Sequence, residues 1–270
     1  MNNTLKILLL ATALSCTQKT AAPVVTIPAA ALATTAIFVG GWVFSGLQGN
    51  SLQDLMFFGK EVYKKPTEMG AGFPCSKYLA RTALAKIPAK TNSQPRAFLE
   101  IGAGTGIVTN EFITTFKNEL REGSTLDVVE LQGPLCDILE KKFATSPGVK
   151  IHCTPIQNFY PNKKYDAIIM TIPFNSFPHS LVQEIWNHIL RNLLAEGGTV
   201  SYVNYAVLPS LKPLVLSSEE KKDFKKTQDY LDELFKKNGI DTKYELRNLL
   251  PMRARYLKFG KEDIQTTAQA

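Results

Sequence analysis

The chain has 270 residues, of which 44% are apolar and 20% are charged, so most of it is globular. Its length allows one α/β domain of about 200 residues and an extension. The formal net charge of +7 favours anionic partners, either phospholipid head groups or nucleic acid. The four cysteines are scattered without a C-x-x-C pair, which excludes a disulfide framework and a metal site and predicts free thiols in a reducing compartment (Cys16, Cys75, Cys136 and Cys153).

The first 50 residues form a leader that is far more apolar than the rest of the chain. Residues 7–15 have the pattern of a signal-peptide core. No charged residue occurs between positions 20 and 53, and residues 29–47 are long enough to cross the hydrocarbon core of a bilayer as a helix. We expect residues 29–47 to be a single-pass membrane anchor; a buried helix or a disordered leader is the alternative. More lysines follow this stretch than precede it, which favours a cytoplasmic location for the rest of the chain.

The next segment, residues 51–95, is expected to contain two helices. Residues 52–65 have the pattern of a short amphipathic helix, and Pro66 ends it. Residues 77–87 follow as a second helix, for which Ser76 supplies the N-cap. Residues 1–50 and 51–95 therefore precede a main domain that we expect over residues 96–265.

In the main domain, predicted strands are separated by predicted helices. This alternation predicts an α/β domain with a mostly parallel seven-stranded sheet and helices on both faces, which is a Rossmann-like arrangement. We expect strands over residues 98–101, 126–130, 149–153, 164–174 (where the strand runs into a proline turn), 199–203, 240–247 and 254–259. We expect helices over residues 107–120, 134–143, 178–194 and 219–237.

Three closely spaced glycines follow the first strand of this domain. Gly102, Gly104 and Gly106 lack the side chains that would keep a ligand away from the backbone, and the helix after them offers free N–H groups. Glu100 precedes the glycines. Glu130 ends the next strand, where a carboxylate can accept hydrogen bonds from both hydroxyls of a ribose. The pattern predicts a nucleoside-binding half of a domain; an ordinary strand–turn–helix corner is the alternative.

The pattern E-x-G-x-G-x-G resembles the first motif of class I S-adenosylmethionine-dependent methyltransferases. In that family the loop wraps the methionine part of the cofactor. The acid before the loop orders it or binds the amino group, and the acid after the second strand holds the ribose, which implies these roles for Glu100, the three glycines and Glu130. Many members have Gly-Asp-Ala after the third strand, where this chain has Cys153-Thr154-Pro155. The recognition of adenine therefore falls to Thr154, Gln157 or backbone groups.

A proline turn follows the fourth strand, at the edge where open α/β sheets place their active sites. Pro173 fixes φ and turns the chain sharply, so that a backbone carbonyl can point at a bound amine. Phe174 and Phe177 supply aromatic faces. Carbonyl oxygens and aromatic faces suit an amine that must lose a proton and whose methylated product is cationic. An apolar strand followed by a proline-capped helix is the alternative for this segment.

Four blocks together resemble the bacterial phospholipid N-methyltransferase family, over about residues 55–260. Members of this family methylate phosphatidylethanolamine stepwise toward phosphatidylcholine. The family is related to rRNA adenine dimethyltransferases, whose turn carries an asparagine where this chain has Thr171, and the loss of that amide argues against binding an adenine N6. The blocks are Pro66-x-x-x-Gly70-Ala71-x-x-Pro74-x-Ser76-x-x-Leu79-Ala80-Arg81, Glu100-Ile-Gly-Ala-Gly-Thr-Gly106, Ile172-Pro173-Phe174-x-x-Phe177-Pro178 and Arg247-Asn248-x-x-Pro251.

The resemblance implies a substrate side lined by Tyr63, Gly70, Ser76, Pro173 and Phe174. We therefore predict a membrane-anchored S-adenosylmethionine-dependent N-methyltransferase that acts on the ethanolamine head group of a phospholipid. Its expected partner is membrane phospholipid rather than nucleic acid. An RNA (adenine) or protein methyltransferase tethered to a membrane is the alternative, and a membrane-tethered interaction module is a third interpretation. The predicted catalytic residues are Tyr63, Thr171, Pro173 and Phe174, and Tyr63, His179 or water could act as the base.

Overall fold

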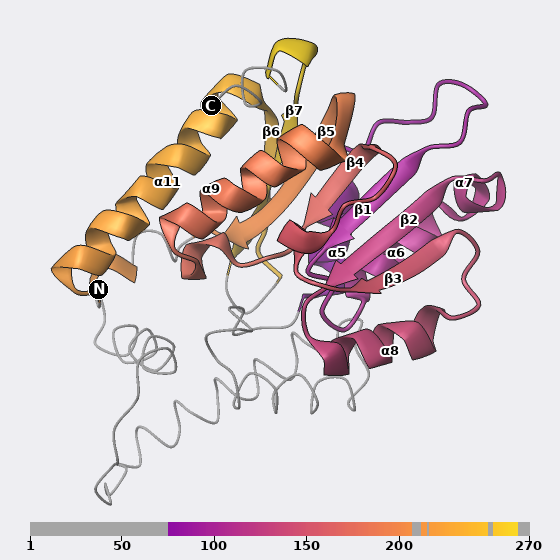
Figure 1. The fold of residues 1–270 in the computed structure, drawn as a ribbon, viewed down its shortest axis with the longest axis horizontal. Coiled ribbons are helices and arrows are strands. Elements are labelled where there is room, and N and C mark those ends of the chain that lie inside the picture. Colours follow the sequence, from indigo (N-terminus) through magenta and orange to yellow (C-terminus); the bar gives the residue numbers. More distant parts are fainter. Residues whose placement is uncertain (1–74, 207–211, 215, 248–250, 264–270) are drawn as a thin grey trace, which may run out of the picture.

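The computed structural model describes residues 75–206, 212–214, 216–247 and 251–263 (Figure 1). The predicted leader, the anchor at 29–47, the amphipathic helix at 52–65, Tyr63 and Gly70 lie outside these residues. Within the described part of the chain, none of the helices is both long and apolar enough to cross a membrane.

A seven-stranded sheet forms the centre of the domain, with the strand order β3–β2–β1–β4–β5–β7–β6. Neighbouring strands are parallel except for β7, which runs antiparallel to both β5 and β6. The predicted, mostly parallel seven-stranded sheet is therefore confirmed. The strands are β1 (Ala97–Ile101), β2 (Thr125–Glu130), β3 (Val149–Cys153), β4 (Tyr165–Met170), β5 (Leu194–Tyr205), β6 (Gly239–Glu245) and β7 (Met252–Lys258).

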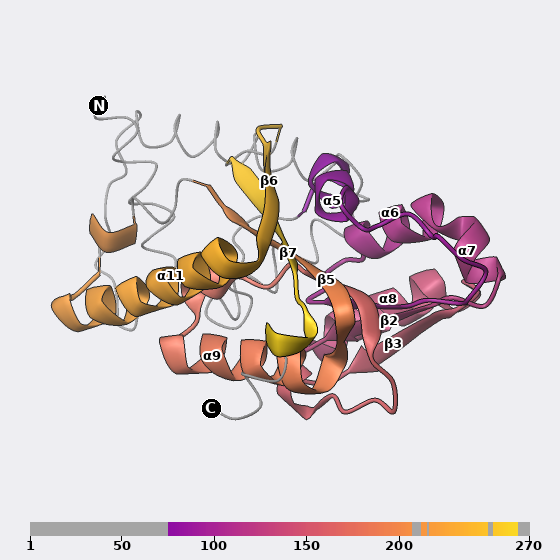
Figure 2. The ribbon, with the colours of Figure 1, turned by 90° about the horizontal axis from the view of Figure 1, so that it is seen from above.

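Helices cover both faces of the sheet, and each face buries its own apolar core. Figure 2 shows α5 and α6 on one side of the sheet and α9 and α11 on the other. Because alternate strand residues point to opposite faces, Phe98 of β1 packs toward α5, α6 and α8, whereas Leu99 packs toward α9 and α11. The helices are α5 (Lys77–Leu84), α6 (Ile107–Thr115), α7 (Lys117–Arg121), α8 (Gly133–Phe143), α9 (His179–His188) and α11 (Ser218–Asn238).

Three predicted helices differ from the structure in where they end. The helix expected over residues 77–87 ends at Leu84. The helix expected over residues 107–120 divides at Phe116 into α6 and α7. The helix expected over residues 178–194 ends at His188 and continues as one π-helical segment, η3 (Ile189–Leu193). Strand β5 then begins at Leu194, five residues earlier than predicted. Its two glycines stay in the sheet because the N–H of Gly197 donates to the carbonyl of Phe259 and the N–H of Phe259 donates to the carbonyl of Gly198.

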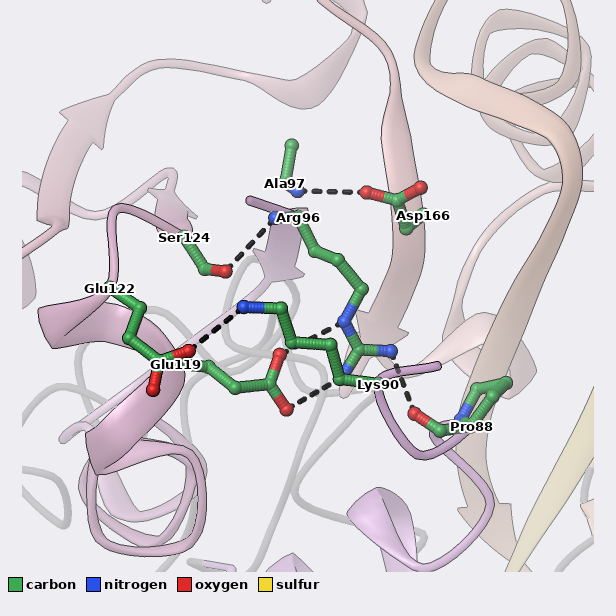
Figure 3. Close-up of polar contacts among 8 residues, drawn as sticks. All are labelled: Pro88, Lys90, Arg96, Ala97, Glu119, Glu122, Ser124 and Asp166. Atoms are coloured by element: carbon green, nitrogen blue, oxygen red, sulfur yellow. Dashed lines mark hydrogen bonds and ion pairs between the residues drawn. The ribbon is translucent and has the colours of Figure 1, made fainter. Parts of the chain in front are cut away.

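The amino ends of the central strands are joined by a network of ion pairs and hydrogen bonds (Figure 3). The Arg96 guanidinium donates to both carboxylate oxygens of Glu119, at 2.8 and 3.0 Å, and to the Pro88 carbonyl at 2.7 Å. The N–H of Ala97 donates to Asp166 of β4 at 2.8 Å, which ties β1 to its neighbour. These contacts hold the strands together at this edge, where the charge of Arg96 is paired with that of Glu119.

The carboxyl ends of β1, β2, β3 and β4 meet at the opposite edge. Parallel pairing places Ile101 beside both Val129 and Met170, and it places Glu130 beside Cys153. The loops after β1, β2, β3 and β4, which carry the predicted cofactor residues and the predicted turn at Thr171, leave the sheet at this edge. Open α/β sheets place their ligands there. Ser76, predicted on the substrate side, lies instead before α5, where its buried hydroxyl oxygen accepts from the N–H of Leu79 and caps the helix as predicted.

Candidate active site

The loop between β1 and α6 contains three glycines with positive φ, at 78° for Gly102, 59° for Gly104 and 85° for Gly106. A Cβ on Gly102 would lie 2.5 Å from Ile172, and one on Gly106 would lie 2.6 Å from Phe143. Among the described residues, a Cβ on Gly104 would meet no atom within 4 Å. Two of the glycines are therefore required by packing within the protein, and Gly104 is the one that keeps the backbone open toward a ligand.

Glu130 lies beside this open position and binds the loop. Its carboxylate accepts hydrogen bonds from the N–H groups of Gly104, Leu131 and Gln132, at 2.8, 2.9 and 3.0 Å. Burial raises the pKa of Glu130, although these three bonds act in the opposite direction. A carboxylate can accept about four hydrogen bonds. Glu130 can therefore accept one more, from a ribose hydroxyl at the Gly104 opening.

Glu100 acts from the other side of the loop. Its side chain is fully buried, and the hydroxyl of Thr109 on α6 donates to one of its oxygens at 2.7 Å. The other oxygen has no hydrogen-bond partner in the described part of the chain. Burial, with a smaller contribution from the charge of Glu130, raises the pKa of Glu100 to about 7. This placement supports the predicted role in ordering the loop, since Glu100 connects β1 to the helix that follows the glycines.

These residues fit the predicted cofactor. The open space at Gly104 leaves room for a ligand against the backbone, and the acceptor atoms of Glu130 lie next to it. Thr154 and Gln157, the residues predicted to contact adenine, follow β3 at the same edge. The N–H of Thr154 donates to the Glu130 carbonyl at 3.0 Å, so the two sides of the predicted nucleoside site are hydrogen-bonded to each other.

A disulfide joins Cys136 of α8 to Cys153, the last residue of β3, with 5.8 Å between their Cα atoms. The prediction of free thiols is therefore wrong for these two cysteines. They are 17 residues apart on separate elements, so no local spacing marks them as partners. The parallel pairing of β3 with β2 brings Cys153 next to the start of α8.

Thr171 connects the turn after β4 to the glycine loop. Its N–H donates to the Ile101 carbonyl at 3.0 Å, and its hydroxyl donates to the Gly102 carbonyl at 2.6 Å. Pro173 follows with φ −84° and leads into a single 3-10 turn, η2 (Phe174–Ser176). The predicted cofactor loop and the predicted acceptor turn are therefore in direct contact.

Phe174 does not lie where an aromatic face for a substrate is needed. Its side chain is fully buried, its ring stacks on Trp186 at 5.9 Å, and its edge meets Tyr202 at 6.0 Å. The ring is therefore enclosed by the core, and Phe174 positions the turn instead of contacting an amine. Phe177 is only half-buried and is the aromatic ring of this turn that remains accessible.

Two residues at this edge were not identified from the sequence. Leu131, next to Glu130, is 53% exposed, which is high for a large apolar side chain and suits a contact with a flat aromatic ligand. Asn175 is 5% exposed; its side-chain oxygen accepts from Gln228 of α11, and its amide nitrogen has no partner in the described part of the chain. Leu131 could have been found as an apolar residue following the acid. The side chain of Asn175 is held by Gln228, which lies 53 residues away along the chain, so no local pattern identifies it.

His179, a candidate base, begins α9. Its backbone N–H donates to Asp223 of α11 at 3.0 Å, and its ring meets Tyr230 edge to face at 5.9 Å. The Nδ1 atom is buried without a partner in the described residues. The ring is therefore packed between two helices rather than held in solvent.

No protein-family model matches the chain. Among curated proteins, it is 27% identical over 107 residues to malonyl-[acyl-carrier protein] O-methyltransferase 1 of Ilyobacter polytropus, covering 40% of this chain and 37% of that protein. It is 23% identical over 158 residues to an ornithine lipid N-methyltransferase of Singulisphaera acidiphila, covering 56% of this chain and 78% of that protein. The matched region thus spans little more than a third of the first relative and most of the second.

Solved structures with a similar arrangement include the N-methyltransferase NodS from Bradyrhizobium japonicum in complex with S-adenosyl-L-homocysteine. It is 12% identical, with a TM-score of 0.49, and the match covers 81% of this chain and 97% of that chain. The CurJ carbon methyltransferase is 15% identical, also with a TM-score of 0.49, covering 95% of this chain and 68% of that chain.

The strand order, the glycine loop and the acid after β2 define a class I methyltransferase fold, as predicted. The matched curated relatives are methyltransferases. Together they support the predicted enzyme class and its predicted cofactor, S-adenosylmethionine.

Proposed function

We propose that this protein transfers methyl groups from S-adenosylmethionine to the amine of a membrane-lipid head group. The observation that carries the proposal is the direct bond between the acceptor turn and the cofactor loop, from the Thr171 hydroxyl to the Gly102 carbonyl. This bond places the turn that resembles phospholipid N-methyltransferases against the loop that would hold the cofactor. The ornithine lipid N-methyltransferase is matched over more of its length than the first relative and supports an amine on a lipid as the acceptor.

The chemistry requires positioning more than side-chain reactivity. When bound, S-adenosylmethionine supplies an electrophilic methyl group. The acceptor amine would present its lone pair to that methyl group, and an N–H proton would leave to a base or to water. Carbonyl oxygens of the turn after β4 can orient the amine N–H groups. No side chain of the protein forms a covalent bond in this reaction.

The location of the protein is part of the same proposal. The charge-free stretch at residues 29–47 would hold the protein in a membrane, where the acceptor lipid is found. Carbonate washing of a membrane fraction tests this anchor, since a peripheral protein is released and an integral one is retained.

Labelled S-adenosylmethionine and the full-length protein in detergent test the acceptor. Parallel reactions contain phosphatidylethanolamine vesicles, ornithine-lipid vesicles, total RNA or malonylated acyl carrier protein. We expect label in one of the two lipids. Label only in RNA or only in the carrier protein would contradict the proposal and identify another acceptor class.

A matched pair of variants tests the role of the turn. Thr171→Val removes the hydroxyl that binds the cofactor loop, and Thr114→Val removes an exposed hydroxyl that binds only its own helix, at Asn110. We expect Thr171→Val to slow lipid methylation roughly five- to tenfold, the value of about one hydrogen bond, and Thr114→Val to leave it unchanged. Equal rates for both variants would show that the contact does not position the acceptor.

A further inference from the structure

The disulfide between Cys136 and Cys153 lies next to the cofactor site and is unequally accessible at its two ends. Cys136 is 2% exposed in α8, whereas Cys153 is exposed at the end of β3. Strand β3 is at the edge of the sheet and pairs only with β2, so its carboxyl end has backbone neighbours on one side. The disulfide links the carboxyl end of β3 covalently to α8, in addition to the hydrogen bonds from β2.

The groups around the disulfide are those that form the predicted nucleoside site. The sulfur of Cys136 lies 3.5 Å from the Glu130 carbonyl oxygen, and the N–H of Thr154 donates to that same oxygen. The N–H of Cys136 donates to the Gln132 carbonyl, and the N–H of Gln132 donates to the Glu130 carboxylate. The disulfide therefore closes a ring that contains the ends of β2 and β3 and the start of α8.

We propose that the Cys136–Cys153 pair is a reversible redox modification site that sets the affinity of the protein for S-adenosylmethionine. In the oxidised form, the bond holds Thr154 and the loop after β3 against Glu130, so the nucleoside site is ordered before the cofactor arrives. In the reduced form, the end of β3 keeps only its hydrogen bonds to β2, and binding must order it.

The exchange reaction balances with a dithiol reductant. A thiolate of the reductant attacks the sulfur of Cys153, the exposed residue of the pair, the S–S bond breaks, and Cys136 leaves as a thiolate near the amino end of α8, where the helix dipole stabilises negative charge. The second thiol of the reductant completes its own disulfide and releases Cys153. Two electrons and two protons pass from the reductant to the two cysteines.

Cys75 provides a contrast within the same domain. It takes part in no disulfide in the described residues. Burial, with a contribution from the charge of Glu100, raises the pKa of its thiol to about 12, so it stays protonated and unreactive. A Cys75→Ser variant is therefore a control that removes a thiol without touching the redox pair.

Peptide mapping of the full-length protein, purified without reductant, establishes the oxidised form. Trypsin would release the two cysteines on peptides 122–141 and 151–163, which a disulfide would keep linked. We expect the linked pair in this sample and two alkylatable peptides after treatment with dithiothreitol. Free thiols at both positions in the untreated sample would overturn the proposal.

Calorimetric titration of S-adenosylmethionine into the oxidised and reduced forms of the same protein tests the consequence. We expect the dissociation constant to rise roughly three- to tenfold on reduction, the cost of ordering one to two groups on binding. Cys136→Ser/Cys153→Ser should bind like reduced wild type and should not respond to dithiothreitol, whereas Cys75→Ser should respond like wild type. Equal dissociation constants for the oxidised and reduced wild type would overturn the proposal. Because cofactor binding is measured, the result does not depend on which acceptor the enzyme uses.

Discussion

The two edges of the central sheet are built from the same strands but in different ways. At the amino-end edge, charged side chains pair with one another, as Arg96 does with Glu119. At the carboxyl-end edge, backbone N–H groups converge on the Glu130 carboxylate, glycines hold positive φ, and space is left at Gly104. The contacts of the first edge lie within the protein, whereas the second edge leaves space for a ligand at Gly104. The open space and the remaining acceptor positions therefore distinguish the binding edge, whereas the number of polar contacts does not.

Replacing Phe174 tests whether this residue belongs to the apolar core or to the acceptor site. Of the variants proposed here, it should have the largest effect on stability. Phe174→Ala leaves a cavity between Trp186 and Tyr202, and we expect a loss of about 3–5 kcal/mol in the free energy of unfolding. Phe177→Ala, at a half-buried ring of the same turn, should cost less. Denaturant unfolding measures both. A stable Phe174→Ala protein that has lost lipid methylation would restore the predicted substrate contact.

The buried carboxyl of Glu100 should make the free energy of unfolding depend on pH. Because burial raises its pKa in the folded state from 4.5 to about 7, the unfolded chain ionises first as the pH rises between these values, and the folded state loses stability. The cost is absent below pH 4.5 and complete above pH 7. Glu100→Gln removes it, so the stability of the variant relative to wild type should rise on the order of 3 kcal/mol between pH 4 and pH 8.

Unfolding curves at several pH values measure this difference. Glu140→Gln, at an exposed position on α8, is the control and should show no such trend. A constant difference between Glu100→Gln and wild type across this range would contradict the placement of a buried, protonatable carboxyl beside the glycine loop.

Arg96 tests the claim that the amino-end edge is structural. Arg96→Met leaves the half-buried Glu119 carboxylate without its main partner, and we expect a loss of about 2–3 kcal/mol in the free energy of unfolding. Lys90→Met breaks the neighbouring pair with the exposed Glu122 and should cost less than about 1 kcal/mol. Both variants should bind S-adenosylmethionine as wild type does. A loss of affinity in either one would show that the two edges are not independent.

Local sequence signals were sufficient to predict the fold and to propose the residues of the cofactor half of the site. A strand, three glycines, a helix and a second strand ending in Glu130 are contiguous in the chain, and parallel pairing brings both strand ends together. The positions of most elements follow in the same way, because alternating strands and helices dictate a parallel sheet.

The features that could not be predicted depend on contacts between distant residues. Phe174 follows a proline and reads as part of an exposed turn, but Trp186 and Tyr202 enclose it. Cys136 and Cys153 have no motif spacing and meet only through the pairing of β2 and β3. The early start of β5 depends on Tyr165 of β4, which pairs with Leu194, and on Phe259, which bonds Gly197 and Gly198 from more than 60 residues away along the chain.

The central claim is that the opening at Gly104 receives S-adenosylmethionine, and one pair of calorimetric titrations tests it most directly. Gly104 and Gly197 both have positive φ, at 59° and 74°, and a Cβ on either would meet no atom of the described part of the chain within 4 Å. Gly104→Arg and Gly197→Arg therefore impose similar backbone strain and differ in whether they fill the proposed site. We predict that Gly104→Arg abolishes S-adenosylmethionine binding in a folded protein and that Gly197→Arg binds with wild-type affinity. Wild-type affinity in folded Gly104→Arg would contradict the account.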